Sequence, residues 1–176
     1  MQIYSYSPKR TNQKALILSI ALVGIPLIGL VVGGILSIPY YSVLQTVAAV
    51  CLAAAVLIAG RFCLRDYQYD IMDSDQGERL IRVVEIQGKR KAIVCMMDLS
   101  NLETCKRVDK TNLREVTDYE NNQEVKGKRY NYCVDISPKE SFRLYFRDGT
   151  ILQIMPDETM RQLIEKEMQN PLLGQE

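Results

Sequence analysis

ALILSIALVG (residues 15–24) opens and AAAVLIAG (residues 53–60) closes a stretch of the chain that contains no Asp, Glu, Lys or Arg. A helix that crosses the hydrocarbon layer of a membrane needs about 20 mostly apolar residues. The stretch is long enough for two such helices, about 15–37 and 41–60, with the break at SIPYY (residues 37–41). The sequence therefore predicts a transmembrane helical hairpin over residues 15–60.

The polar remainder is a short segment before the hairpin and a longer one after it. Residues 1–14 are expected to be a cytoplasmic N-terminal tail, and residues 61–176 suffice for one small domain with a single core. All 21 acidic residues and 19 of the 22 basic ones follow Gly60. The domain therefore has a net charge of −2, and it lacks the excess of basic residues that is typical of a nucleic-acid-binding protein.

The distribution of cations around the apolar stretch predicts its orientation. Lys9, Arg10 and Lys14 precede the first helix, Arg61 and Arg65 follow the second, and the connecting turn carries no charge. Because Lys and Arg that flank membrane spans stay in the cytoplasm, both termini and the whole domain are expected on the cytoplasmic side of the cell membrane.

A cleaved signal peptide is the competing interpretation of the first apolar segment. Its apolar core is normally about 7–15 residues long and ends at a small-residue cleavage site. The segment from Ala15 to Ile38 is longer, and a second apolar segment follows at once. These features favour a multi-pass membrane protein.

Small residues recur at four-residue spacing in both predicted spans. Gly29 and Gly33 form a GxxxG in the first, and Ala49 and Ala53 have the same spacing in the second. Small residues let helices approach closely in a membrane. The pattern indicates either packing of the two helices of one hairpin or a seam between two copies in a homodimer.

After Arg65 the apolar residues alternate with polar ones, which is typical of half-buried strands. Gly88 and Asp148-Gly149 predict tight hairpin turns. Between them, residues 109–128 are polar and predict a long loop. Seven strands are expected, at residues 66–72, 79–86, 91–99, 101–108, 129–136, 141–147 and 150–155.

A C-terminal helix is expected from about Glu158 to Gln169. Asp157 can cap its first turn, and Asn170-Pro171 ends it. Met160, Leu163, Ile164 and Met168 form an apolar stripe that should pack on the sheet.

A two-helix hairpin followed by seven strands and a capping helix resembles the bacterial two-span membrane proteins with a cytoplasmic pleckstrin-homology-like (PH-like) domain. The segments that carry the resemblance are Asp66–Ile71, Arg79–Ile86, the turn at residues 88–91 and the helix after Pro156-Asp157. It implies an α+β chain whose domain is an antiparallel β-roll of about seven strands. It implies no catalytic residue.

Lys89, Arg90 and Lys91 form a basic turn that resembles the headgroup-binding loop of phosphoinositide-binding PH domains. The hypothesis is contact with lipid headgroups. The alternative is a solvated turn whose charges prevent aggregation of the sheet.

Catalytic chemistry has little support in the sequence. There is no histidine, which excludes Ser-His-Asp and Cys-His nucleophiles and HExxH metal sites, and no GxxxxGK[ST] or GxGxxG loop. No catalytic residue, metal site or cofactor is therefore predicted.

The sequence favours a non-enzymatic membrane protein that presents a small PH-like interaction domain to a protein partner in the membrane or cytoplasm. The alternatives are an accessory subunit of a membrane transport or signalling complex, and an enzyme with an unrecognised carboxylate or cysteine site.

Overall fold

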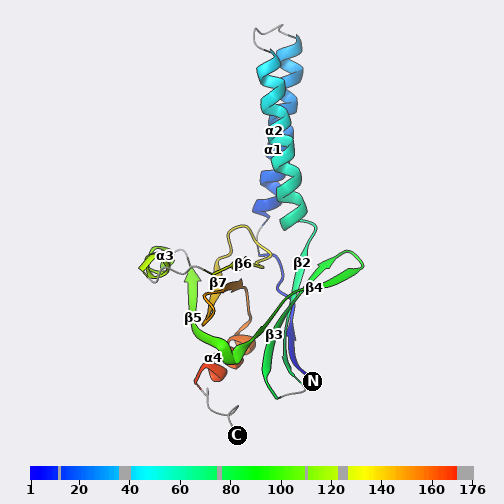
Figure 1. Cartoon of the computed structure of the whole chain (residues 1–176). Helices are drawn as coiled ribbons and strands as arrows, with labels where there is room; N and C mark the ends of the chain where they lie inside the picture. Colours follow the sequence, from blue (N-terminus) through cyan, green and yellow to red (C-terminus); the bar gives the residue numbers. More distant parts are fainter. Residues whose placement is uncertain (12, 36–40, 75–76, 110, 123–126, 170–176) are drawn as a thin grey trace. The chain divides into compact units, whose positions relative to one another are not determined.

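The structure, a computed structural model, describes residues 1–11, 13–35, 41–74, 77–109, 111–122 and 127–169. The chain is α+β and forms two compact units (Figure 1). The helical unit is Asn12–Arg65, and the polar unit combines Met1–Thr11 with Asp66–Glu176. In chain order the elements are β1 Gln2–Tyr6, α1 Lys14–Ile35, α2 Tyr41–Phe62, β2 Asp66–Asp73, β3 Arg79–Gln87, β4 Arg90–Asp98, a short 3-10 helix Leu99–Asn101, β5 Leu102–Asp109, α3 Leu113–Asn122, β6 Arg129–Asn131, β7 Glu140–Phe146, β8 Ile151–Ile154 and α4 Glu158–Gln169.

The helical unit consists of α1 and α2, two 22-residue helices that are long and apolar enough to cross a membrane. Their bounds lie within two residues of the predicted spans, and residues 36–40 of the predicted turn lie outside the described residues. Most of their side chains are not buried within this chain: Ile25 is 71% exposed and Leu57 is 74% exposed. The two helices are therefore not core helices of this fold.

Sheet A has four antiparallel strands in the order β1-β2-β3-β4. Strand β1 corrects the expectation that residues 1–14 are a tail. Five residues with two tyrosines give only a weak strand signal by themselves. Strand β1 forms because it pairs with β2, which follows the two helices in the chain. The N-terminal segment is thus part of the folded domain.

Sheet B has the order β5-β7-β8-β6, so the described residues form eight strands instead of seven. Its β6–β8 pair is parallel, which corrects the expectation of a purely antiparallel roll. Strand β6 ends at Asn131, well before the predicted end at Ile136. A side chain on Gly127 would overlap the backbone of Gly149, and Gly149 has a φ of 80°, so both positions favour glycine where the chain enters β6 beside the β7–β8 turn.

One hydrophobic core lies between the two sheets, and α4 contributes to it. From sheet A it contains Tyr67, Tyr69, Ile71, Ile81 and Val83; from sheet B it contains Phe142, Leu144, Phe146, Leu152 and Ile154. Met160 and Ile164 of α4 are 0% and 1% exposed, which confirms the predicted apolar stripe. The buried face of α4 could therefore be predicted from the sequence.

Residues 113–122 form helix α3, which corrects the expectation of a loop over residues 109–128. Val116 and Glu120 are buried, at helical spacing. The Glu120 carboxylate accepts hydrogen bonds from Arg143 (2.7 Å) and from the Tyr145 hydroxyl (2.8 Å). A polar helix forms here because one of its acidic residues binds basic and phenolic groups of β7.

A second buried carboxylate links three strands of sheet A. Asp70 of β2 is fully buried and accepts hydrogen bonds from Ser5 of β1 (2.7 Å), from Gln68 (2.9 Å) and from Arg82 of β3 (2.7 and 3.0 Å). Burial raises the pKa of Asp70, but these donors outweigh burial, and the net pKa lies below the ordinary value of an aspartate.

We expect Ile164→Asp to unfold the polar unit. The change would place a charge in the core, at a cost on the order of several kcal/mol, comparable to the whole stability of a small domain. Near-UV circular dichroism of the tyrosines in the detergent-purified chain reports this unfolding. Gln162→Asp, at an exposed position of the same helix, should melt like the wild type. A cooperative wild-type transition in Ile164→Asp would contradict the packing of α4 on the sheets.

We expect Asp70→Asn to destabilise the polar unit at pH 7, by about 2–3 kcal/mol, because Arg82 would lose its partner. A carboxylate with a lowered folded-state pKa stabilises the fold above its unfolded-state pKa of about 4 and loses that contribution as pH falls through the folded-state value. The loss of stability below about pH 4 should therefore be smaller in Asp70→Asn than in the wild type. Unfolding midpoints across this range measure it, and Asp118→Asn, at an exposed position, should retain the wild-type profile.

Candidate functional site

The predicted basic turn joins β3 to β4. Gly88 has a φ of 59°, a left-handed conformation that glycine adopts without strain. Lys89, Arg90 and Lys91 are exposed, and within the part of the chain that the structure describes they form no ion pair. Their charges are therefore available to an external anion.

Strand register places this turn at the end of sheet A where β2 begins. Asp66, the first residue of β2, pairs with Ile86, and Ile86 pairs with Lys91. The chain enters the sheet from α2 at Asp66. The turn and the entry point of the chain are thus neighbours across three strands.

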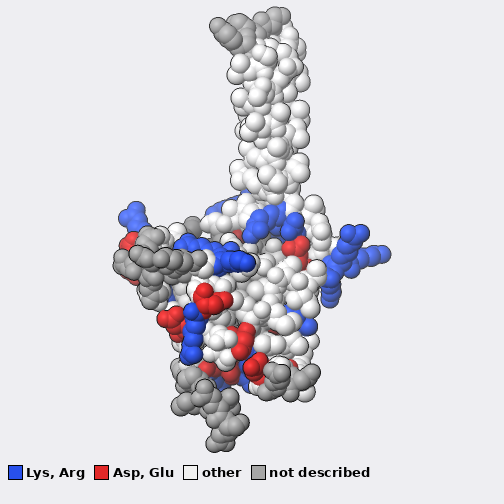
Figure 2. Space-filling model, in the orientation of Figure 1, with Lys and Arg blue, Asp and Glu red and all other residues white. Residues whose placement is uncertain are grey.

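The segment that follows β1 reaches the same end of the sheet. Tyr6 pairs with Tyr69, the Ser7 hydroxyl donates to the Tyr67 carbonyl, and Arg10 forms an ion pair with Asp66 (2.8 Å). We call the group Lys9, Arg10, Lys89, Arg90 and Lys91 the basic end of sheet A. Figure 2 shows basic side chains at the tip of the β3–β4 hairpin.

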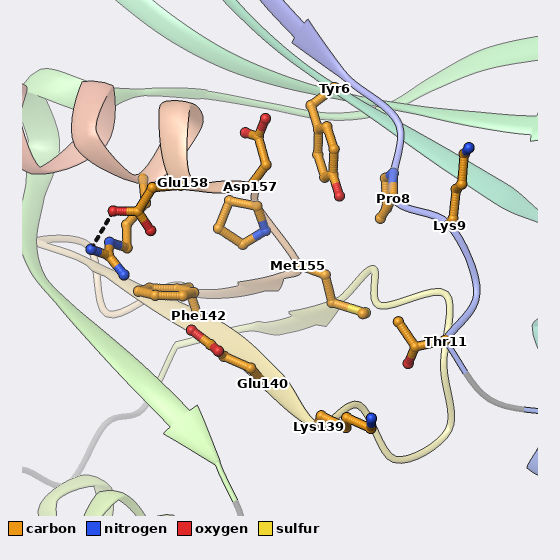
Figure 3. A pocket seen from close by; sticks show the side chains of 12 residues that line it. Tyr6, Pro8, Lys9, Thr11, Lys139, Glu140, Phe142, Met155, Asp157 and Glu158 are labelled. Atoms are coloured by element: carbon orange, nitrogen blue, oxygen red, sulfur yellow. Dashed lines mark hydrogen bonds and ion pairs between the residues drawn. The ribbon is translucent and has the colours of Figure 1, made fainter.

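A cavity of about 290 Å³ opens beside this end, between the segment after β1, the start of β7 and the start of α4 (Figure 3). Apolar groups line it from three segments: Pro8, Phe142, Met155 and Pro156. Figure 3 shows the Tyr6 ring pointing into it, and Lys9 and Lys139 on opposite rims. This volume suits a small headgroup or metabolite, since ligand pockets start at about 300 Å³.

The carboxylates that line the cavity already have partners. Asp157 accepts from the Tyr4 hydroxyl and caps α4 through the Met160 amide (3.0 Å). Glu158 pairs with Arg161 (2.6 Å), and Glu140 pairs with Arg107 (2.9 Å). Lys9, Lys139 and the Tyr6 hydroxyl have no such partner among the described residues. The cavity therefore has an excess of free donors.

Tyr6 and Tyr4 are protonated at neutral pH. Burial and the neighbouring Asp157 raise the pKa of Tyr6. The hydrogen bond to Asp157 and burial raise the pKa of Tyr4. The Tyr6 hydroxyl is thus a neutral donor.

The predicted small-residue seam is only partly used inside the hairpin. Gly33 is buried, and a Cβ added there would lie 2.9 Å from Leu44 of α2; a Cβ on Gly29 would lie 3.8 Å from the same residue. Ala49 and Ala53 are exposed on α2, whose buried residues are Ala48 and Ala55. Contact of Ala49 and Ala53 with a second copy stays a prediction.

Cysteine chemistry is disfavoured at two of the three cysteines in the polar unit, Cys95 and Cys105. Burial raises the pKa of the Cys105 thiol to about 12 and also raises that of Cys95. Since the thiolate is the nucleophile, these two cysteines are unreactive at neutral pH. The described residues contain no group of three or more Cys, Asp or Glu that could hold a metal ion.

The sequence did not single out the cavity. In the sequence Lys9 indicates only membrane topology, and no spacing rule links it to Lys139, 130 positions further along the chain. Pairing of β1 with β2 is what brings them to one cavity.

Comparison with known proteins gives no assignment: no family model, curated protein or solved structure matches the chain.

Proposed function

We propose that this chain is an integral membrane protein in which α1 and α2 cross the bilayer as a hairpin and the polar unit serves as a non-enzymatic binding module at the cytoplasmic face. One observation carries the proposal. The polar unit is built from both segments that flank the helices, since β1 before α1 pairs with β2 after α2.

Strand pairing requires both flanking segments to be on the same side of any membrane that the helices cross. Two crossings satisfy this requirement and one does not. The five flanking cations favour the cytoplasm as that side. The same pairing argues against a cleaved signal peptide, because cleavage after the first helix would remove an edge strand of sheet A.

The resemblance to proteins with a PH-like domain stays part of the proposal. The order of seven strands followed by a C-terminal helix supports it. The additional strand β1 and the parallel β6–β8 pair depart from the expected roll. The proposal of an interaction module does not depend on this family.

A binding role is supported by unpaired charge at the surface in combination with the scarcity of reactive groups. The basic turn has three free cations, whereas Glu120 and Asp70 are engaged in ion pairs and Cys105 is protonated. We infer that the partners are the bilayer and a protein in or at the membrane. Purification of the chain in mild detergent should retain a stoichiometric protein partner, whereas a bound metal ion or redox cofactor would favour the enzyme alternative.

The topology is tested by single cysteines in a variant without native cysteines. We expect Gln2→Cys and Gln162→Cys, both at exposed positions, to be protected from an impermeant maleimide in intact cells and labelled after permeabilisation. Ser37→Cys in the predicted outer turn should be labelled in intact cells. Labelling of Gln2→Cys and Gln162→Cys on opposite sides would overturn the two-span hairpin.

The basic turn is tested in the full chain reconstituted into nanodiscs, with an environment-sensitive probe on Gln87→Cys. Each cation near an anionic surface contributes about 1 kcal/mol. We therefore expect the probe to report a less polar environment with anionic than with zwitterionic lipid at low salt. The difference should disappear at high salt, where charges are screened, and when Lys89, Arg90 and Lys91 are all replaced by Gln.

The matched control removes the same charge elsewhere. Arg114, Lys128 and Lys166 are exposed, lie outside the turn and form no ion pair with the described residues. Their triple replacement by Gln should leave the probe response unchanged. Equal responses of the turn variant and the wild type would show that the turn is only a solvated hairpin.

A further inference from the structure

We propose that the cavity between the segment after β1, the start of β7 and the start of α4 binds a phosphate group of small-headgroup size. A lipid of glycerol-phosphate type or free phosphate could supply that group. This inference deepens the proposed function and rests on it only for the choice of a lipid as the source.

The sign of the ligand follows from the donors and acceptors that remain free. The lining contains three cations and three carboxylates, but Asp157, Glu158 and Glu140 are already bound by Tyr4, Arg161 and Arg107. Arg161 and Arg107 neutralise Glu158 and Glu140, whereas Asp157 keeps its negative charge. Lys9 and Lys139 supply two positive charges against that one, so the unpaired charge of the lining favours an anion.

Three free donors surround the cavity. The Lys9 and Lys139 ammonium groups are exposed on opposite rims, and the Tyr6 hydroxyl lies inside (Figure 3). As drawn, the Lys9 ammonium points away from the cavity, and rotation about its four side-chain bonds would turn it toward a bound anion. A phosphate offers several acceptor oxygens, which matches donors on different sides.

The size and the floor of the cavity restrict the ligand further. About 290 Å³ accommodates a phosphate with a few carbon atoms but not a whole phospholipid. Phe142 and Met155 provide apolar contact for carbon atoms. A headgroup whose chains leave the cavity is compatible with this volume.

The connection along the chain favours a lipid as the source. Thr11 lines the cavity, and α1 begins at Lys14, three residues later. Three residues span at most about 10 Å. If α1 crosses the membrane, the covalent chain keeps this lining within reach of the headgroup layer.

The test uses the full chain in neutral detergent, so that its result does not depend on membrane orientation. Three probes are titrated separately: dihexanoyl phosphatidylglycerol, dihexanoylglycerol and inorganic phosphate. Binding is followed by the fluorine signal of 3-fluorotyrosine at Tyr6, which Tyr6→Phe identifies. We expect the phosphatidylglycerol probe to shift this signal and the uncharged dihexanoylglycerol to leave it unchanged.

Lys9→Gln combined with Lys139→Gln should weaken binding about tenfold or more, because charge-assisted hydrogen bonds are lost. Arg114→Gln combined with Lys166→Gln removes the same charge outside both the cavity and the basic turn, and should change the affinity less than twofold. Inorganic phosphate is the second probe of the source. If it binds as tightly as the phosphatidylglycerol probe and its binding depends equally on Lys9 and Lys139, the site is supported and its ligand is soluble phosphate.

Equal binding of dihexanoylglycerol, equal affinity of the Lys9/Lys139 variant and the wild type, or no shift with either phosphate probe overturns the inference. None of these results bears on the two-span hairpin, which the cysteine labelling decides. Conversely, a failure of the labelling prediction would leave phosphate binding in detergent intact.

Discussion

Pairing of β1 with β2 is the interaction on which the rest of the structure depends. It joins segments separated by the whole helical unit, and it adds the edge strand that carries Tyr4, Ser5 and Tyr6 to sheet A. Closing so long a connection costs conformational entropy, although the cost grows slowly with length. Because α1 packs against α2 in the hairpin, folding of the helices already brings the two ends of that connection together (Figure 1).

Much of the fold could be predicted because periodicity reports burial. The two apolar helices, most of the strands and α4 have an apolar pattern that can be recognised locally. Strand β1 and helix α3 have none: QIYSY is short, and α3 is polar along most of its length. Both elements exist through tertiary contacts, β1 through its ladder with β2 and α3 through Glu120. Local propensity is a weak predictor where such contacts decide.

The candidate site shows the same division. Exposure of Lys89, Arg90 and Lys91 followed from a hairpin turn that the sequence encodes, with Gly88 at its positive φ. The cavity could not be predicted in this way, because its free donors come from segments far apart in the sequence that only the folded topology brings together. Lys9 illustrates the difference. A cation before a membrane span is readable as a topology signal, but its place on the rim of a cavity depends on where β1 ends.

Buried carboxylates explain how these distant segments find one arrangement. Asp70 receives donors from β1 and β3, Glu120 receives donors from β7, and the buried Asp135 accepts from the Thr11 amide (3.1 Å) and hydroxyl. Such pairs add little net stability after desolvation, but a buried carboxylate left without its donors is costly. Each pair therefore destabilises arrangements in which the donors are missing more than it stabilises the native arrangement. The Asp135 pair acts at Thr11, directly before the helical unit begins at Asn12, so it fixes the end of the segment that lines the cavity.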